Sequence, residues 1–204
     1  MSSGACEAMF KAGGQPGSQP GGQPHGPTNR LAPKELYSPF GGPHRSICGL
    51  TSASPLSARP ACIPQPCPSK LSPSKQAGLR LERQLQAALP GSVRGQWFSF
   101  QDDNGPGVCQ PDLLFPFLPY FLCVIEIKYT LVPGAHQKLN SLYIPVVQAA
   151  LRKPCAGVVI VKNLDPRYRR GRIFTDLKAA ADAAFDRGFP TLVQWSGQSL
   201  LRSV

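Results

Sequence analysis

Two neighbouring apolar stretches, residues 108–115 and 120–131, define the centre of the sequence. In the second stretch the side chains alternate with a period of two, which is typical of a β-strand. One face carries Cys123, Ile125, Ile127 and Tyr129, and the other carries Val124, Glu126, Lys128 and Thr130. An acidic and a basic side chain therefore interrupt an otherwise apolar strand. Burying such charges is costly unless they are paired or have a chemical role.

The pattern beyond residue 72 predicts alternating strands and helices. Ser72-Pro73-Ser74 is a helix-start signal, and residues 78–89 continue it with an apolar stripe. A second helix is predicted at residues 136–151, where Pro145 should cause a kink or a break. Turns are predicted at 102–107 and 116–119, further strands at 96–101, 156–161 and 191–195, and further helices at 176–187 and 197–204. The order α-β-β-β-α-β-α-β predicts an α/β domain with a mixed central sheet flanked by helices.

The first 73 residues have a different composition. They hold 13 of the 23 prolines and half of the glycines, with few large apolar residues and no apolar periodicity. Such a segment buries too little surface to offset the entropy of ordering. We therefore expect a disordered basic arm at residues 1–73 and a folded domain at residues 74–204. The arm would attract DNA weakly, or act as a linker or as a tail that docks on a larger protein complex.

The charge of the chain favours a polyanionic partner. The 22 Lys and Arg residues outnumber the 11 Asp and Glu residues, which gives a net charge of +11. This surplus favours nucleic acid over a membrane but carries no sequence specificity. No apolar run reaches the roughly 18 to 20 residues that span a bilayer, and the first residues lack the apolar core of a signal peptide. We expect a cytoplasmic protein.

Pro111-Asp112 and Glu126-Ile127-Lys128 are the candidate chemical centre. Asp112 and Glu126 on adjacent strands would hold Mg²⁺ or Mn²⁺, and Lys128 would place an attacking water, which suits cleavage of a phosphodiester. The alternative is a salt bridge on a sheet edge, but the apolar flanks favour a central strand. A hairpin centred between residues 117 and 118 would pair Asp112 with Cys123, three residues short of Glu126. The turn must therefore be asymmetric or the strand must contain a bulge.

With this order of elements, the motif resembles the PD-(D/E)XK nuclease superfamily, which includes restriction endonucleases and RecB-like nucleases. The resemblance covers residues 74–195 and implies a restriction-endonuclease-like fold. The strings WFSFQDDNGPGVCQPDLL, IEIKYT and HQKLNSLYIPVVQ are also similar to small proteins of bacterial viruses, in which case the compartment is the host cytoplasm.

The resemblance implies further site residues. Glu82 matches an acidic residue on the first helix, and the main-chain oxygen of Ile127 matches a metal ligand. Gln137 matches a polar residue on the following helix, although the residue four positions later is Ser141 and the tyrosine is Tyr143. Glu82 at the border of the stripe and Gln137 in a first turn are equally typical of solvated residues. A basic loop would bind the nucleic-acid backbone or only be solvated, and it contains Arg167, Arg169, Arg170 and Arg172.

These patterns together predict a Mg²⁺-dependent deoxyribonuclease. Duplex DNA is the favoured substrate, an endonuclease is favoured over an exonuclease, and a homodimer is compatible with the sequence. The alternative is a protein with a nuclease fold but no catalysis, which binds nucleic acid or acts as an adaptor. Such an adaptor would belong to a replication, recombination or phage DNA-packaging complex.

Overall fold

A six-stranded mixed sheet organises the part of the chain that the computed structural model describes, residues 45–63, 71–117, 120–132, 134–164 and 172–201. These residues belong to one compact unit. The strands lie in the order β2 (Val93–Arg94), β5 (Leu113–Phe117), β6 (Phe121–Thr130), β7 (Cys155–Asn163), β9 (Thr191–Gln194) and β8 (Ile173–Phe174). The pairs β2/β5 and β5/β6 are antiparallel, whereas β6/β7, β7/β9 and β8/β9 are parallel.

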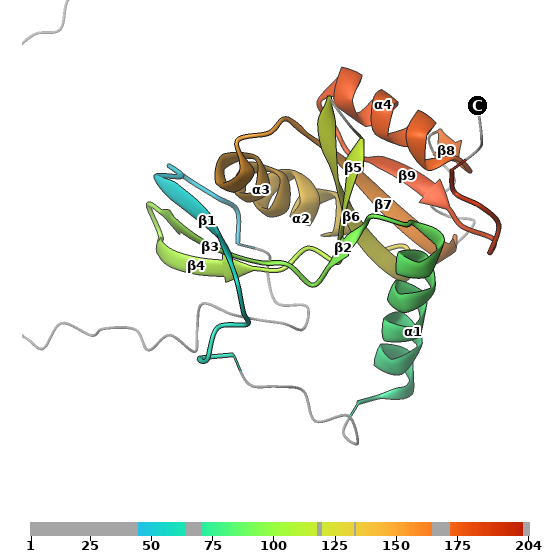
Figure 1. The fold of residues 1–204 in the computed structure, drawn as a ribbon, viewed down its shortest axis with the longest axis horizontal. Coiled ribbons are helices and arrows are strands. Elements are labelled where there is room, and N and C mark those ends of the chain that lie inside the picture. The colour runs from blue at the N-terminus through green and yellow to red at the C-terminus, as the bar shows by residue number, and fades with distance from the viewer. Residues whose placement is uncertain (1–44, 64–70, 118–119, 133, 165–171, 202–204) are drawn as a thin grey trace, which may run out of the picture. The chain divides into compact units, whose positions relative to one another are not determined.

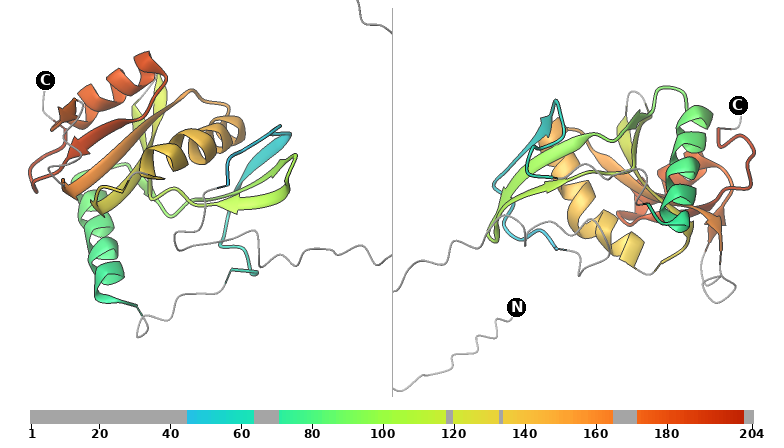
Figure 2. Two further views of the ribbon diagram at one scale, coloured as in Figure 1. Left: turned by 180° about the vertical axis from the view of Figure 1, so that it is seen from behind. Right: turned by 90° about the horizontal axis from the view of Figure 1, so that it is seen from below.

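Helices cover both faces of this sheet, as Figures 1 and 2 show. One face packs against α1 (Pro73–Ala88) and α4 (Leu177–Arg187), and the other packs against η3 (Leu139–Tyr143) and α3 (Ile144–Leu151), which continue from α2 (Gly134–Lys138). The prediction of an α/β fold with a mixed, helix-flanked sheet is confirmed. Every helix in the described residues is too short or too polar to span a bilayer.

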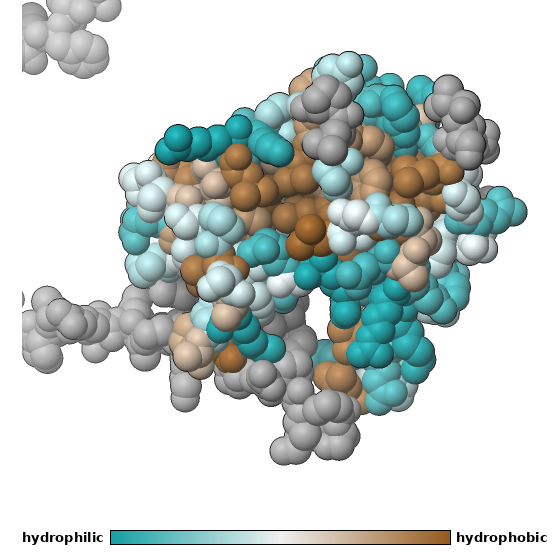
Figure 3. All heavy atoms as spheres, viewed as in Figure 1, coloured by the Kyte–Doolittle hydropathy of each residue, from teal (hydrophilic) through white to brown (hydrophobic). Residues whose placement is uncertain are grey.

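Helix α1 forms as the sequence predicts. The Ser72 side chain caps it by accepting a hydrogen bond from the Lys75 amide, and Pro73 lies in its first turn, where its missing N–H costs nothing. Leu81 and Leu85 are buried against the sheet. The outer surface of the helix is mainly hydrophilic, whereas apolar residues gather over the sheet between α3 and α4 (Figure 3).

The register of the β5–β6 hairpin brings the two parts of the motif together. Leu113 pairs with Ile125, and Phe117 pairs with Phe121. The paired residues are symmetric about position 119 rather than about the 117–118 bond, and the same register extended by one residue sets Asp112 across from Glu126. The expectation of an asymmetric turn or a bulge was therefore wrong for the paired residues, because the hairpin is centred later in the sequence than 117–118 and its ladder is continuous. The alternation of β6 is also confirmed, because Ile125 and Ile127 face α1 and α4 while Val124 faces α3.

A second, three-stranded sheet corrects two expectations. It contains β1 (Ser52–Leu56), β3 (Trp97–Asp102) and β4 (Gly105–Cys109), in the order β1-β3-β4. The single strand predicted at residues 108–115 is instead two strands in different sheets, because the chain leaves β4 at Gln110 and enters β5 at Leu113. Strand β1 lies within the predicted arm, so ordered structure in the described residues begins well before residue 72. Pairing with β3 orders this segment without any apolar periodicity of its own.

The predicted break at Pro145 takes the form of a π-helical turn. The segment η3 separates α2 from α3, and Pro145 lies in the first turn of α3. The wider π turn interrupts the regular hydrogen-bond pattern just before the proline, which has no N–H to contribute.

The C-terminal prediction is only partly correct. Helix α4 is capped by Asp176, whose carboxylate accepts a hydrogen bond from the Ala179 amide, and strand β9 follows as predicted. The helix predicted at 197–204 is wrong for residues 197–201, which form bends rather than a helix. The rest of that segment lies outside the described residues.

A buried ion pair attaches the chain just before β1 to the β3–β4 hairpin. Arg45 donates to the carboxylate of Asp102, which is 3% exposed, and to the carbonyl of Gly105 at 2.7 Å. Burial alone would raise the pKa of Asp102, but hydrogen bonds from Arg45 and Asn104 outweigh burial and hold this pKa below its ordinary value. The stability that the pair contributes is therefore present above the unfolded-state pKa and is lost as the pH falls through the lower folded-state value.

We predict that Arg45→Met lowers the free energy of unfolding by about 2–3 kcal/mol at pH 7, because Asp102 then lacks its cation. The deficit should shrink below about pH 4, where Asp102 is protonated in the unfolded chain. Urea unfolding at pH 7 and pH 3 measures both values. Arg83→Met, on the exposed side of α1, is the matched control and should change stability by less than about 0.5 kcal/mol. An equally small effect of Arg45→Met at pH 7 would show that the pair does not anchor the segment.

Candidate functional site

Asp112 lies immediately before β5 and is held against β6 by the main chain. Its Oδ2 accepts a hydrogen bond of 2.6 Å from the amide of Ile127. Burial and the negative charge of Glu126 raise the pKa of Asp112 to about 7, although the positive charge of Lys128 opposes this rise. The neutral carboxyl form of Asp112 is therefore favoured below about pH 7, and a bound cation would favour the ionised form.

Glu126 is completely buried in the centre of β6. Its Oε1 accepts from the ammonium groups of Lys128 and Lys138, the latter at 3.2 Å. Its Oε2 is buried and has no hydrogen-bond partner. Buried polar atoms in native proteins are almost always paired with protein groups or with ordered water, so this oxygen can accept a hydrogen bond from water or bind a cation.

Lys128 projects from the same face of β6, two residues after Glu126, because side chains of a strand alternate. Burial alone would lower the pKa of Lys128, but the negative charges of Glu126 and Asp112 outweigh burial and raise it above the ordinary value. Lys128 is therefore an ammonium ion at neutral pH. It can donate hydrogen bonds to a water molecule or to an anion, but it cannot accept a proton.

Lys138 is a site residue that the sequence did not predict. It lies at the end of α2, and its Nζ is 4.5 Å from the centroid of the Tyr143 ring as well as in contact with Glu126. The π turn η3 separates this lysine and this tyrosine by five positions while keeping both on one side of the helix. The Lys138–Tyr143 pair therefore does not follow the spacing of three or four residues that is typical of a regular α-helix.

Glu82 lies near the site but is engaged elsewhere. Its Oε2 accepts from Nε of Arg94 at 3.2 Å and from a terminal nitrogen of the same guanidinium at 3.0 Å. Its charge still acts on the site, since it contributes to raising the pKa of Asp112. As the structure stands, Glu82 is an electrostatic neighbour of the carboxylate pair and not a member of it.

The remaining predicted residues do not join this cluster. Gln137 is exposed, and its neighbour His136 stacks on Phe189 with ring centroids 6.4 Å apart. Arg172 is exposed and lies over the ring of Phe174 at 4.7 Å. The other arginines of the predicted basic loop, Arg167, Arg169 and Arg170, lie outside the described residues.

The donor set fits a divalent cation. Within the described residues, no group of three or more His, Cys, Asp or Glu side chains is placed to hold a metal ion. Asp112 and Glu126 nevertheless present two carboxylates, and Mg²⁺ is commonly bound by one or two carboxylates with water completing its shell. The unpartnered Oε2 of Glu126 is the atom of this structure that such an ion would satisfy.

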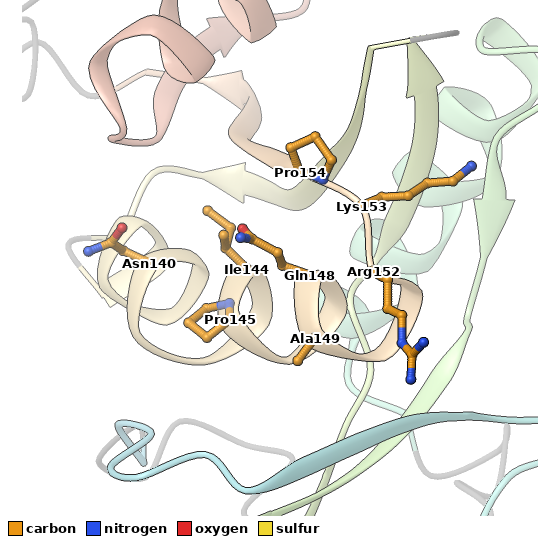
Figure 4. Close-up of a pocket in the computed structure, with 8 residues that line it drawn as sticks. All are labelled: Asn140, Ile144, Pro145, Gln148, Ala149, Arg152, Lys153 and Pro154. Atoms are coloured by element: carbon orange, nitrogen blue, oxygen red, sulfur yellow. The ribbon is translucent and has the colours of Figure 1, made fainter.

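A groove of about 750 Å³ runs along the outer side of η3 and α3, apart from this cluster. The carboxylates and the two lysines described above are not among its lining residues. Figure 4 shows that Arg152 and Lys153, its two cations, point in different directions. The groove therefore lacks the convergent charges that would make it a second anion site.

We predict that Asp112→Asn stabilises the metal-free protein at neutral pH. The pKa of Asp112 rises from 3.8 to about 7 on folding, so wild-type stability should fall as the pH rises through that interval. The asparagine oxygen still accepts from Ile127 but cannot ionise. Thermal unfolding in EDTA should show a gain on the order of 2 kcal/mol at pH 8 that shrinks towards pH 5.

Asp182→Asn, which removes a carboxylate from the surface pair with Lys178 on α4, serves as the control and should show no such pH dependence. A less stable Asp112→Asn variant at pH 8 in EDTA would contradict the account, since it would mean that the ionised carboxylate is favoured in the folded protein.

Comparison of the chain with protein-family models, with curated proteins and with solved structures finds no match. The cluster formed by Asp112, Glu126, Lys128 and Lys138 is therefore the basis for the functional proposal.

Proposed function

We propose that this chain is a metal-dependent nuclease that hydrolyses phosphodiester bonds in DNA through Asp112, Glu126 and Lys128. The observation that carries the proposal is the Glu126 carboxylate, which is buried with one unpartnered oxygen in register with Asp112. A purely structural ion pair does not need a second carboxylate whose pKa is raised by burial and by the charge of the first. Two carboxylates that repel each other are useful when a divalent cation joins them.

The order of elements supports the restriction-endonuclease-like part of the proposal. Helix α1, the antiparallel strands β2, β5 and β6, the helical segment from α2 to α3, and the parallel strand β7 follow one another as in the resemblance to the PD-(D/E)XK superfamily. The hairpin β3–β4 is then an insertion between the first and second strands of that core. Strand β2, with two residues, replaces the longer first strand that the sequence predicted.

In this proposal Asp112 and Glu126 hold Mg²⁺ or Mn²⁺, with the main-chain oxygen of Ile127 as a further ligand implied by the resemblance. When bound, such an ion stabilises negative charge on the phosphate and lowers the pKa of bound water. The chain contributes the positions of the two carboxylates. The Ile127 amide fixes Asp112, and the centre of a ten-residue strand fixes Glu126.

The role of Lys128 follows from its charge. Its ammonium group lies next to Glu126 and would donate hydrogen bonds to the attacking water and to a phosphate oxygen. The water oxygen forms a new bond to phosphorus, and the bond between phosphorus and the 3′-oxygen breaks. The proton from the attacking water passes to solvent, and the leaving oxygen receives a proton from solvent. Lys128 remains protonated and offsets the added negative charge.

The proposed substrate is a polyanion, in keeping with the net charge of +11. Duplex DNA is the favoured form, and internal cleavage is favoured over cleavage from ends.

We predict that the full-length protein cleaves DNA in the presence of Mg²⁺ or Mn²⁺ and not in EDTA. Asp112→Asn, Glu126→Gln and Lys128→Met should each lower the cleavage rate by about 100-fold or more, because each removes a group that acts on the reacting phosphate. The measurement is conversion of supercoiled plasmid to nicked or linear products, beside linear duplex and single-stranded DNA.

Lys178→Met is the matched control for loss of a lysine, because Lys178 lies on the surface of α4, where it pairs with Asp182. It should cleave at the wild-type rate, and each variant is checked for cooperative thermal unfolding. The proposal fails if the folded wild-type protein cleaves none of these substrates with either metal, or if the three site variants cleave as fast as Lys178→Met. Binding of DNA without cleavage would instead favour the non-catalytic nuclease fold.

A further inference from the structure

Lys138 duplicates a contact that Lys128 already makes. Both ammonium groups contact Oε1 of Glu126, whereas Oε2 has no partner. One carboxylate oxygen therefore has two cations while the other has none. Such a distribution is unfavourable for a permanent structural ion pair, in which both oxygens would be satisfied.

The charges of the four side chains explain why the second lysine is present. Asp112 and Glu126 carry two negative charges when ionised, and Lys128 and Lys138 carry two positive charges. Even with both carboxylates ionised, the two ammonium groups therefore compensate the cluster without any metal. A divalent cation would bring two further positive charges close to both ammonium groups, and like charges at this range repel strongly in a partly buried site. Moving one of the lysines away from Glu126 would relieve this repulsion.

Lys138 is the lysine that can move. Lys128 is attached to the central strand only two residues from Glu126, so its backbone cannot withdraw. Lys138 reaches Glu126 from a different element, α2, at 3.2 Å, and its Nζ already lies over the face of Tyr143. The aromatic face provides a second favourable position for the ammonium group, because a cation over a ring is stabilised by the ring's negative face.

We propose that Lys138 holds Glu126 in the metal-free protein and is displaced from it when a divalent cation binds, so that Lys138 weakens the metal affinity of the site. This inference rests on the metal site of the proposed function. In it Lys138 is a positioning residue: it keeps the buried carboxylate compensated and folded in place until the cation arrives. The metal-free fold thus gains stability from the same contact that opposes metal binding.

The test is Mn²⁺ binding by isothermal titration calorimetry, with thermal unfolding in EDTA and in saturating Mn²⁺. Lys138→Met should bind Mn²⁺ about 5-fold or more tightly than the wild-type protein. In EDTA it should unfold at a lower temperature than wild type, and in saturating Mn²⁺ the difference should disappear. Lys138→Arg, which keeps the charge and reach, should bind close to the wild-type affinity.

Lys153→Met removes one positive charge from an exposed turn and is the control for a general effect of net charge. It should leave the Mn²⁺ affinity unchanged. Should Lys138→Met fail to fold, Lys138→Gln provides the same comparison, because its amide can still donate to Glu126 without a charge. It too should bind Mn²⁺ more tightly.

Two results would overturn the inference while leaving the proposed metal site intact. One is wild-type or weaker Mn²⁺ affinity in Lys138→Met and Lys138→Gln, together with a loss of affinity in Asp112→Asn. The other is a loss of stability that is equal in EDTA and in Mn²⁺, as expected for a purely structural lysine. If the wild-type protein binds no Mn²⁺, or if Asp112→Asn binds it as tightly as wild type, the metal site and this inference fail together.

Discussion

The burial of Glu126 in the middle of an apolar strand is the constraint on which the candidate site depends. Leaving such a carboxylate without a cation would cost about 3–5 kcal/mol, a large part of the stability of an ordinary domain. The fold supplies two ammonium groups from two different elements, β6 and α2, and still leaves Oε2 unpartnered. In the proposed function, this incomplete compensation leaves Oε2 available to a divalent cation.

The surrounding architecture serves to keep this carboxylate beside Asp112. The β5–β6 register sets the two residues opposite one another, and the Ile127 amide holds Asp112 in place. Helices on both faces exclude water from the strand, which strengthens each electrostatic interaction within it. The π turn between α2 and α3 then places Lys138 and Tyr143 on the side of the helix that faces the site.

Local sequence patterns correctly predicted the elements that form from short-range interactions. The alternation in β6, the cap at Ser72 and the apolar run of β7 all have short-range signals, and the motif residues Asp112, Glu126 and Lys128 could be found from them. Features that depend on tertiary pairing could not be predicted. Strand β1 has no apolar period and is ordered by β3 and by the pair of Arg45 with Asp102.

The break between β4 and β5 was missed for a similar reason, because residues 108–115 are apolar enough to be one strand and only the sheet assignments divide them. Lys138 was missed because its contact with Glu126 depends on how α2 packs against β6, whereas the resemblance pointed to the neighbouring Gln137. In both cases the long-range fold overrides a correct reading of the local pattern.

The most direct test of the central claim is the position of a bound metal ion in crystals of the full-length protein grown with Mn²⁺. The account predicts an anomalous scattering peak between Asp112 and Glu126, at about 2–2.5 Å from Oε2 of Glu126. A map without a peak at this position at saturating Mn²⁺, with both lysines still on Oε1, would contradict it. The buried carboxylate would then be part of a structural ion pair.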